Sequence, residues 1–172
     1  RAKLVESVTI SGGEPTLHTD LPNFIRQVKD MGYLVKLDSN GSNPMMLEKL
    51  LHEKLLDFVA MDVKAPLGRY EAVAGVAIAP EILAQSIALI KNSGVDYEFR
   101  TTVVKSLHKI ADFDEIGHAI SMGSKAKRYA LQHFQPAKTL DPKFASDTTF
   151  SESDFALLAE KMSAYADEVI VH

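Results

Sequence analysis

The chain has 172 residues, 46% hydrophobic and 24% charged, with a formal net charge of −4, which is enough apolar sequence for one domain spanning residues 1–172. The acidic balance and the absence of a basic run exclude a nucleic-acid surface, and no apolar stretch is long enough to span a membrane. Without a leader segment or any cysteine, the chain is expected to be a cytoplasmic protein that has neither disulfides nor thiolate chemistry.

The first part of the chain alternates β-branched runs with helical periodicity. A strand is predicted over Leu4–Ile10, ending at a diglycine turn, and a helix follows with Thr19 as its N-cap, Pro22 in its first turn and Gly32 at its end. The next predicted elements are a strand over Tyr33–Asp38, a helix that begins at Asn43-Pro44, and a strand over Asp57–Asp62.

The remainder continues the same alternation. The predicted elements are a helix over Pro80–Ser93, a strand over Tyr97–Val104, a helix over Asp112–Met122, a strand over Arg128–Phe134, a helix over Asp154–Tyr165 that follows a capping box at Ser151, and a strand over Glu168–Val171. The stretch Gln135–Thr149 has no periodic pattern. Strands separated by helices predict an α/β fold with parallel strands, either an open sheet covered on both faces or part of a (β/α) barrel.

Polar residues gather where the predicted strands end, and this is where parallel α/β folds place their ligands. The segments concerned are Ser11-Gly12-Gly13-Glu14-Pro15, Asp38-Ser39-Asn40-Gly41, Asp62-Val63-Lys64, Glu98-Phe99-Arg100 and Gln132-His133. We therefore expect several of these side chains to converge on one edge of the sheet.

The first two segments have both a functional and a structural interpretation. Gly12 and Gly13 let the backbone approach a ligand and Glu14 can accept from an ammonium group, although a tight turn with a surface glutamate is equally compatible with the sequence. Asp38 and Asp62 end neighbouring strands, where two carboxylates repel unless a cation or a positive ligand group lies between them. For Asp38 the alternative is an Asx-type turn.

The remaining candidates are cationic or aromatic. Lys64 is two residues after Asp62 and is placed to bind a ligand carboxylate, unless it is an ordinary solvated lysine. Arg100 lies inside a strand, where a charge needs a partner, so a functional or ion-paired role is favoured. Of the six histidines only His133 is at a strand end; the other five are expected at the surface, and none has metal-ligand spacing.

The motifs, taken together and in order, point to a family. SGGEPTLHTDL, VKLDSNGSNP, VAMDVKAPLGRYE, GVDYEFRTTVV and LQHFQPAKTLDP resemble the radical S-adenosylmethionine (SAM) activating enzymes, in particular the activating proteins of anaerobic ribonucleoside-triphosphate reductases and the related pyruvate formate-lyase activating enzymes. The resemblance covers nearly the whole chain. GGEP alone is moderately specific, whereas the ordered set of motifs is strongly specific.

The resemblance implies a role for each strand-end segment. Glu14 and the backbone of Gly12 and Gly13 would bind the amino group of SAM, and Arg100 would lie near its ribose or carboxylate. His133, or its neighbour Gln132, would lie near the adenine. The residues implied near the methionine carboxylate are Asp38, Ser39, Asn40, Asp62 and Lys64, and the aspartates Asp38 and Asp62 would also hold a monovalent cation.

The family also carries a CxxxCxxC segment that binds a [4Fe-4S] cluster, and this chain has no cysteine. The resemblance therefore implies a fragment, the C-terminal part of a longer parent protein. The implied fold is a partial (β/α)6 radical-SAM barrel whose first βα unit is missing. The fragment alone would contain no catalytic residue and would be inactive.

The activity implied for the parent protein is activation of a glycyl radical enzyme. Reductive cleavage of SAM at the cluster would be followed by hydrogen abstraction from a glycine of the partner, for which an anaerobic ribonucleoside-triphosphate reductase is expected, with a separate electron donor. Two alternatives remain open. One is a radical SAM enzyme that acts on a small molecule, and the other is a cluster-free module of the same fold that binds a cofactor or a partner.

Overall fold

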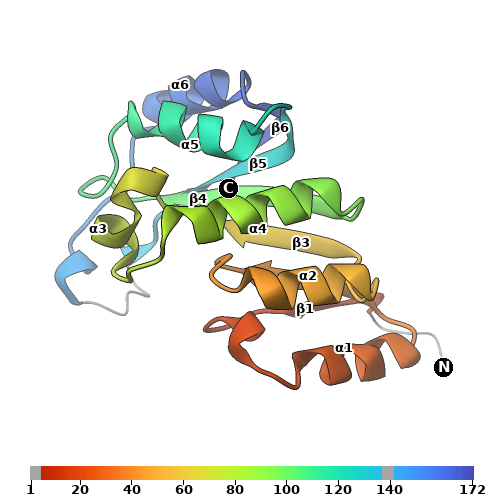
Figure 1. Cartoon of the computed structure of the whole chain (residues 1–172). Helices are drawn as coiled ribbons and strands as arrows, with labels where there is room; N and C mark the ends of the chain where they lie inside the picture. The colour runs from red at the N-terminus through yellow and green to blue at the C-terminus, as the bar shows by residue number, and fades with distance from the viewer. Residues whose placement is uncertain (1–4, 137–141) are drawn as a thin grey trace. The chain divides into compact units, whose positions relative to one another are not determined.

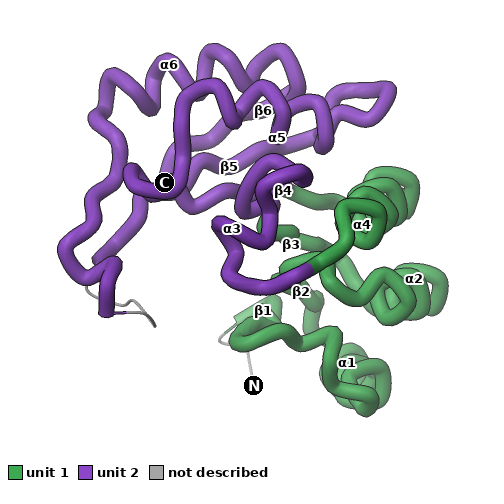
Figure 2. Tube along the Cα trace, turned by 60° about the vertical axis from the view of Figure 1, so that its left-hand side comes forward, with its two compact units in different colours: residues 1–62, 78–98 green, residues 63–77, 99–172 purple. Residues whose placement is uncertain are grey.

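A computed structural model describes residues 5–136 and 142–172. The chain divides into two compact units, coloured green and purple in Figure 2: the first contains residues 1–62 and 78–98, and the second residues 63–77 and 99–172. Leu4, the predicted start of the first strand, lies outside the described residues, as does part of the motif LQHFQPAKTLDP. The expectation of one domain over 1–172 stays a prediction.

The first unit is a parallel sheet with helices (Figure 1). Its strands pair in chain order, with Thr9 opposite Lys36 and Asp38 opposite Ala60. The elements are β1 (Ser7–Ile10), α1 (Leu21–Asp30), β2 (Leu34–Ser39), α2 (Pro44–His52), β3 (Phe58–Asp62) and α4 (Pro80–Asn92), with a short 3-10 turn, η1 (Pro15–Leu17), after β1.

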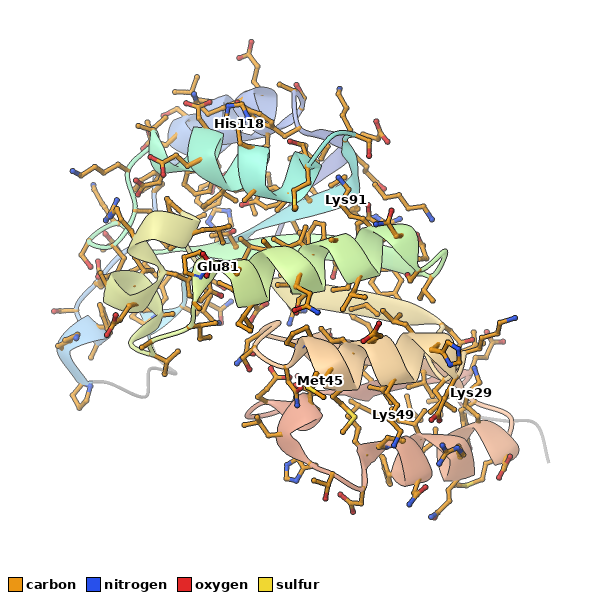
Figure 3. All side chains as sticks on the ribbon, in the orientation of Figure 1. Lys29, Met45, Lys49, Glu81, Lys91 and His118 are labelled. Carbon is orange, nitrogen blue, oxygen red and sulfur yellow. The ribbon has the colours of Figure 1, made fainter. Side chains whose placement is uncertain are left out.

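The sequence of α2 explains why this helix forms and which side it buries. Asn43 caps it by accepting from the backbone N–H of Met46 at 3.2 Å, and proline begins its first turn. Leu47 and Leu50 are fully buried, whereas Met45 and Lys49 are exposed (Figure 3). Together with the buried Pro44, Leu47 and Leu50 recur every three positions and give the helix one apolar stripe.

The second unit repeats the arrangement with three parallel strands. These are β4 (Asp96–Val103), β5 (Ala126–His133) and β6 (Ala166–Val171), with α3 (Tyr70–Ala74), α5 (Asp112–Ser121), α6 (Glu152–Met162) and the turns η2 (Leu67–Arg69) and η4 (Pro142–Phe144). The first three residues of β4 fall in the first unit. The capping box predicted at Ser151 is confirmed, since Ser151 and Asp154 bond each other's backbone.

Burial alternates along β2 and along β4, so the two faces of each of these strands differ. In β2, Val35 and Leu37 are fully buried, whereas the side chains of Lys36 and Asp38 are 32% and 16% exposed. In β4, the even-numbered positions from Glu98 to Thr102 are half-buried or exposed between buried neighbours. In both strands one face carries polar, partly exposed side chains, which favours the partial barrel over the alternative of an open sheet covered on both faces.

The prediction of an α/β fold with parallel strands is confirmed, with differences at element ends. The N-cap of α1 is Asp20, not Thr19, because the helix begins only at Leu21, directly before its proline. The α3 segment was not predicted, since five residues are too few to show periodicity. Among the described residues, no helix has the length and hydropathy needed to cross a membrane.

Candidate functional site

The loop after β1 is shaped by its two glycines. Gly12 has φ +99° and Gly13 has φ +55°, in the left-handed region that favours glycine. The loop then leads into η1, whose N-cap is Glu14. A groove of about 270 Å³ lies beside the loop, and its lining includes Ile10, Ser11, Gly12, Pro15 and His18.

Glu14 is buried, with 8% of its surface exposed, and its carboxylate accepts four hydrogen bonds. Oε1 accepts from the backbone N–H and the hydroxyl of Thr16, at 3.2 and 2.5 Å, and from the hydroxyl of Ser39 at 2.9 Å. Oε2 accepts from the backbone N–H of Asn40 at 2.6 Å. The alternative of a surface glutamate is therefore wrong. Oε1 accepts three of the four bonds and Oε2 one, so Oε2 is the oxygen better able to accept a further donor.

The end of β2 faces this carboxylate. Ser39 is 3% exposed, and its hydroxyl oxygen also accepts from the backbone N–H of Gly41 at 3.1 Å. The Asx-type turn that the sequence suggested for Asp38 is made by Asn40, whose Oδ1 accepts from the backbone N–H of Ser42 at 2.9 Å. Ser39 and Asn40 are thus fixed against Glu14 by hydrogen bonds that connect two strand ends.

Asp38 points to the polar face of the sheet and has a cation from its own strand nearby. Its Oδ1 is 3.7 Å from Lys36 Nζ, which is an ion-pair distance too long for a hydrogen bond. The same ammonium is 3.4 Å from Glu98 Oε1 and lies over the ring of Phe58, 5.2 Å from its centroid. This cluster was missed, because nothing in the sequence connects Lys36 with Glu98, which is 62 residues away.

Asp62 lies on the same face of the first-unit sheet as Asp38. Asp38 is opposite Ala60, and Asp62 is two residues further along β3, so side-chain alternation places both carboxylates on one side. No group of three or more potential metal-ligating side chains occurs among residues 5–136 and 142–172. The monovalent cation stays a prediction for these two aspartates.

In the second unit, Lys64 and Arg100 belong to segments joined by a hydrogen bond. The backbone N–H of Val63, between Asp62 and Lys64, donates to the carbonyl of Arg100 at 2.9 Å. Both Lys64 and Arg100 are half-buried. The structure therefore brings the backbones of these two predicted cationic residues onto adjacent segments.

His133 is placed differently from Gln132. The ring of His133 stacks on Phe155 of α6, with centroids 3.9 Å apart, on the side of β5 that the helix covers. Gln132 faces the other way and accepts from the hydroxyl of Thr102 at 3.2 Å, on the polar face to which Arg100 also belongs. Of the two residues considered for the adenine, Gln132 therefore shares a face with Arg100.

Among the remaining histidines, His108 departs from the expected surface position. It is 4% exposed and its ring contacts backbone atoms of Val104 and Lys64. No sequence pattern indicated this, because His108 lies in the loop between β4 and α5. Burial of an aromatic ring with two polar nitrogens requires hydrogen-bond partners for both, and the structure supplies them.

Comparison with known proteins gives consistent matches. The sequence matches the Radical SAM superfamily over residues 1–117. It is 33% identical over 172 residues, covering 96% of this chain and 70% of the relative, to the protein named "Putative glycyl-radical enzyme activating enzyme MJ1227" of Methanocaldococcus jannaschii. A second protein of that organism with the same kind of name, MJ1632, is 34% identical over 61 residues, 36% of this chain and 23% of its own length.

Two solved structures show the same fold. A domain of pyruvate-formate lyase-activating enzyme from Bacteroides vulgatus matches 98% of this chain and 99% of its own with a TM-score of 0.77 at 13% identity. Streptococcus suis SuiB bound to S-adenosylmethionine matches 96% of this chain and 39% of its own with a TM-score of 0.69 at 14% identity. At these identities the likeness concerns the fold, and it confirms the α/β architecture predicted from the sequence.

Proposed function

This chain belongs to the radical SAM superfamily, and from that premise we propose that it is the SAM-binding part of an activating enzyme for a glycyl radical enzyme. The curated relative that carries such a name supports the reaction class. When bound, SAM would supply the means of removing a hydrogen atom from a glycine of the partner, with the one electron that its cleavage needs coming from the cluster of the parent protein. The residues of this chain bind and orient SAM and exclude water from it.

The donor set of the strand ends fits SAM. Glu14 offers its second Oε2 lone pair to the amino group, while the Gly12-Gly13 backbone lets the ligand approach closely. Lys64 provides a positive charge for the methionine carboxylate. The further residues proposed to contact SAM are Asp38, Ser39, Asn40 and Asp62 near the carboxylate, Arg100 near the ribose or carboxylate, and His133 or Gln132 near the adenine.

One observation carries this proposal: the buried, four-fold hydrogen-bonded carboxylate of Glu14 at the diglycine loop, beside a polar sheet face. Parallel sheets are normally covered by apolar groups on both faces. A face that keeps Lys36, Asp38 and Glu98 partly exposed is better suited to a polar ligand than to a packed helix.

The residues of this chain do not fit an iron–sulfur cluster. The cluster needs thiolate ligands, and the sequence contains no cysteine. The proposal therefore assigns SAM to this chain and the [4Fe-4S] cluster to residues of the parent protein outside the printed sequence. The two aspartates Asp38 and Asp62 are proposed as ligands of a monovalent cation.

A glycyl radical partner must insert a backbone loop, so its activating enzyme needs an open surface at the strand ends. The second unit has a groove of about 640 Å³ lined by the end of α3 and by the segments around Leu107 and Phe144. This volume is large enough for a few residues of a partner loop, as it also is for a small molecule. We propose an anaerobic ribonucleoside-triphosphate reductase as the partner, a separate electron donor, and a cytoplasmic location.

Activity is tested on the intact parent protein, prepared without oxygen and loaded with its cluster. The expected result is reductant-dependent formation of 5′-deoxyadenosine, measured by chromatography, and a protein-based radical in the partner, measured by electron paramagnetic resonance. 5′-Deoxyadenosine without a radical in any glycyl radical enzyme would favour a small-molecule substrate. If neither 5′-deoxyadenosine nor the radical forms although SAM binds, the alternative of a cluster-free binding module would be favoured.

The binding role is tested separately by calorimetric titration of SAM. Glu14→Gln keeps the size of the side chain but removes its charge, so we expect SAM affinity to fall by about tenfold. Glu160→Gln, an exposed position on α6, is the matched control and should leave the affinity unchanged. Equal affinity of the Glu14 variant and the unaltered protein contradicts the role given to Glu14.

A further inference from the structure

The segment after β3 leaves the strand but stays buried. Val63 is 1% exposed and Ala65 is fully buried, so the backbone groups between them need partners. The backbone N–H of Val63 donates to Arg100, and its carbonyl accepts from the hydroxyl of Thr101 at 2.5 Å. Just beyond the end of β3, a side-chain hydroxyl therefore provides the hydrogen-bond partner of a backbone carbonyl.

A buried tyrosine determines which groups donate in the hydrogen bonds that lead to the carbonyl of Val63. The hydroxyl of Tyr129 is 2.6 Å from Thr101 Oγ1, and burial raises the pKa of Tyr129 above its ordinary value. The phenol thus stays protonated and donates to Thr101, whose own proton is directed to the carbonyl of Val63. Thr101 of β4 and, through it, Tyr129 of β5 therefore fix the backbone of Val63.

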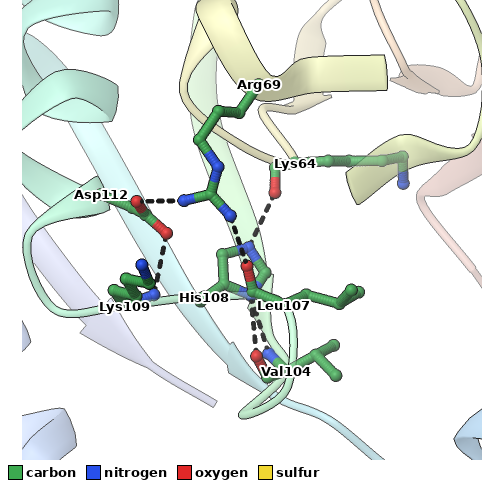
Figure 4. Close-up of polar contacts among 7 residues, drawn as sticks. All are labelled: Lys64, Arg69, Val104, Leu107, His108, Lys109 and Asp112. Carbon is green, nitrogen blue, oxygen red and sulfur yellow. Dashed lines mark hydrogen bonds and ion pairs between the residues drawn. The ribbon is translucent and has the colours of Figure 1, made fainter. Parts of the chain in front are cut away.

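The next carbonyl, that of Lys64, is held by a histidine ring. His108 Nε2 is 2.8 Å from this oxygen, and the backbone N–H of Val104 is 3.0 Å from His108 Nδ1 (Figure 4). A carbonyl only accepts, so Nε2 carries a proton; an N–H only donates, so Nδ1 does not. Both contacts are satisfied by one tautomer of the neutral ring.

A second acceptor near Nδ1 does not change this assignment. The carbonyl of Val104 is 3.1 Å from Nδ1, but it already accepts from the backbone N–H groups of Leu107 and His108, at 3.1 and 2.9 Å. A proton on Nδ1 would leave the N–H of Val104 without this acceptor inside the protein, which is unfavourable. The neutral ring with its proton on Nε2 satisfies every group named.

We propose that His108 is a positioning residue that fixes the backbone of Lys64 so that its ammonium meets the carboxylate of the ligand. Figure 4 shows the carbonyl of Lys64 directed at the ring and its side chain extending away from it. A lysine side chain has several rotatable bonds, so a fixed starting point reduces the entropy lost when it binds. This inference rests on the proposed function, in which Lys64 binds the carboxylate of SAM.

A neighbouring contact joins the same two loops and provides a matched control. Arg69 Nη1 is 2.6 Å from Asp112, a carboxylate that is 6% exposed and also accepts from the backbone N–H of Lys109 at 2.8 Å. Arg69 donates as well to the carbonyl of Leu107 at 3.3 Å. Figure 4 shows this ion pair as a contact separate from the bond between His108 and the carbonyl of Lys64, so breaking the pair should loosen the loops and leave that bond in place.

The test compares the affinity of the intact parent protein for SAM and for decarboxylated SAM, which lacks the methionine carboxylate. The quantity measured is the ratio of the two dissociation constants. Lys64→Ala should shift this ratio about tenfold against SAM, and His108→Ala should shift it in the same direction by about threefold to tenfold. Arg69→Gln should leave the ratio unchanged, even if it lowers the unfolding midpoint.

A conservative variant separates positioning from folding. In His108→Gln the side-chain amide can donate to the carbonyl of Lys64 and accept from the N–H of Val104, so the ratio should return toward its original value. If His108→Ala does not fold, His108→Gln against His108→Leu gives the same comparison. An equal loss for both ligands in the His108 variants, with Lys64→Ala still selective, overturns the positioning role alone. An unselective Lys64→Ala overturns the role of Lys64 and the inference with it.

Discussion

The backbone N–H of Asn40 donates to Oε2 of Glu14 at 2.6 Å, across 26 residues of sequence. This bond fastens the loop after β1 to the loop after β2, and Ser39 adds a second bond to the same carboxylate. Glu14 is therefore part of the folded framework in addition to its proposed role in binding. Its substitution is expected to affect stability even without ligand.

Replacing Glu14 by alanine removes four hydrogen bonds from a buried carboxylate and leaves the N–H of Asn40 without this acceptor. We expect the free energy of unfolding to fall by about 3 kcal/mol, because bonds to charged groups are strong and buried donors are costly to leave unpaired. Urea unfolding followed by circular dichroism measures this. The control Glu160→Ala should change the value by less than about 0.5 kcal/mol, and an equal effect of both variants would contradict the buried network.

Gly41 is predicted to accept a side chain only if the side chain of Met61 shifts. Its φ is +74°, and a Cβ at this position would lie 2.1 Å from Cε of the fully buried Met61. Gly94, with φ +76° and open space around it, shares the backbone strain without the clash. Gly41→Ala should therefore lower the free energy of unfolding by about 1–3 kcal/mol more than Gly94→Ala.

A double-mutant cycle tests whether the clash with Met61 is the cause. Met61→Ala creates space, so the combined variant Gly41→Ala/Met61→Ala should be more stable than the sum of the single effects, by about 1–3 kcal/mol. Simple additivity of the two substitutions, measured by urea unfolding, would show that the methionine is not responsible.

The cap of α6 predicts a dependence of stability on acid pH. The hydrogen bond from Ser151 lowers the pKa of Asp154 below its ordinary value. A carboxyl group whose pKa is lower in the folded state stabilises that state above its ordinary pKa, near 4, and this contribution is lost as the pH falls through the lowered value. Asp154→Asn should flatten the fall of the unfolding free energy below about pH 4.

Ser151→Ala tests the same cap at neutral pH. It removes the acceptor for the backbone N–H of Asp154 and should lower the free energy of unfolding by about 1 kcal/mol. Glu160→Gln, on the same helix, should preserve the acid slope of the unaltered protein. If Asp154→Asn and Glu160→Gln have the same slope, the cap does not determine the titration.

Tyr129 predicts an effect at alkaline pH. Because burial raises its pKa, the folded protein holds this proton more tightly than the unfolded chain, and stability falls as the pH rises above the ordinary tyrosine value of about 10. Tyr129→Phe should weaken this fall while lowering the free energy of unfolding at neutral pH by about 1 kcal/mol. Tyr33→Phe, at a less buried position, is the control, and an equal alkaline slope in the two variants would contradict the effect of burial at Tyr129.

Local sequence signals were sufficient for most of the fold. Asn43 before Pro44 and Ser151 before Asp154 mark helix starts through bonds made within three residues, so the sequence alone reveals them. The strand ends likewise follow from turns such as the one at Gly12 and Gly13. The five-residue helix α3 was missed because it is shorter than two helical turns.

The site was less predictable, because its contacts join distant residues. Glu14 was recognised as a candidate, but its burial depends on Ser39 and Asn40, which only the folded chain brings near. The sequence also could not decide between Gln132 and His133, since adjacent strand residues face opposite sides and the ring of Phe155 attracts the histidine. His108 was missed for the same reason, as its partners are backbone atoms, which leave no signature in side-chain patterns.

The alternation along the strands also bears on how such proteins diversify. Buried positions such as Val35 and Leu37 pack on the helix side of the sheet, whereas the alternate positions Lys36 and Asp38 face the other side. Substitutions at the second set can change what is bound without disturbing the packing of the first. A lineage can in this way replace most of its residues while its architecture persists, in keeping with a TM-score of 0.77 at only 13% identity.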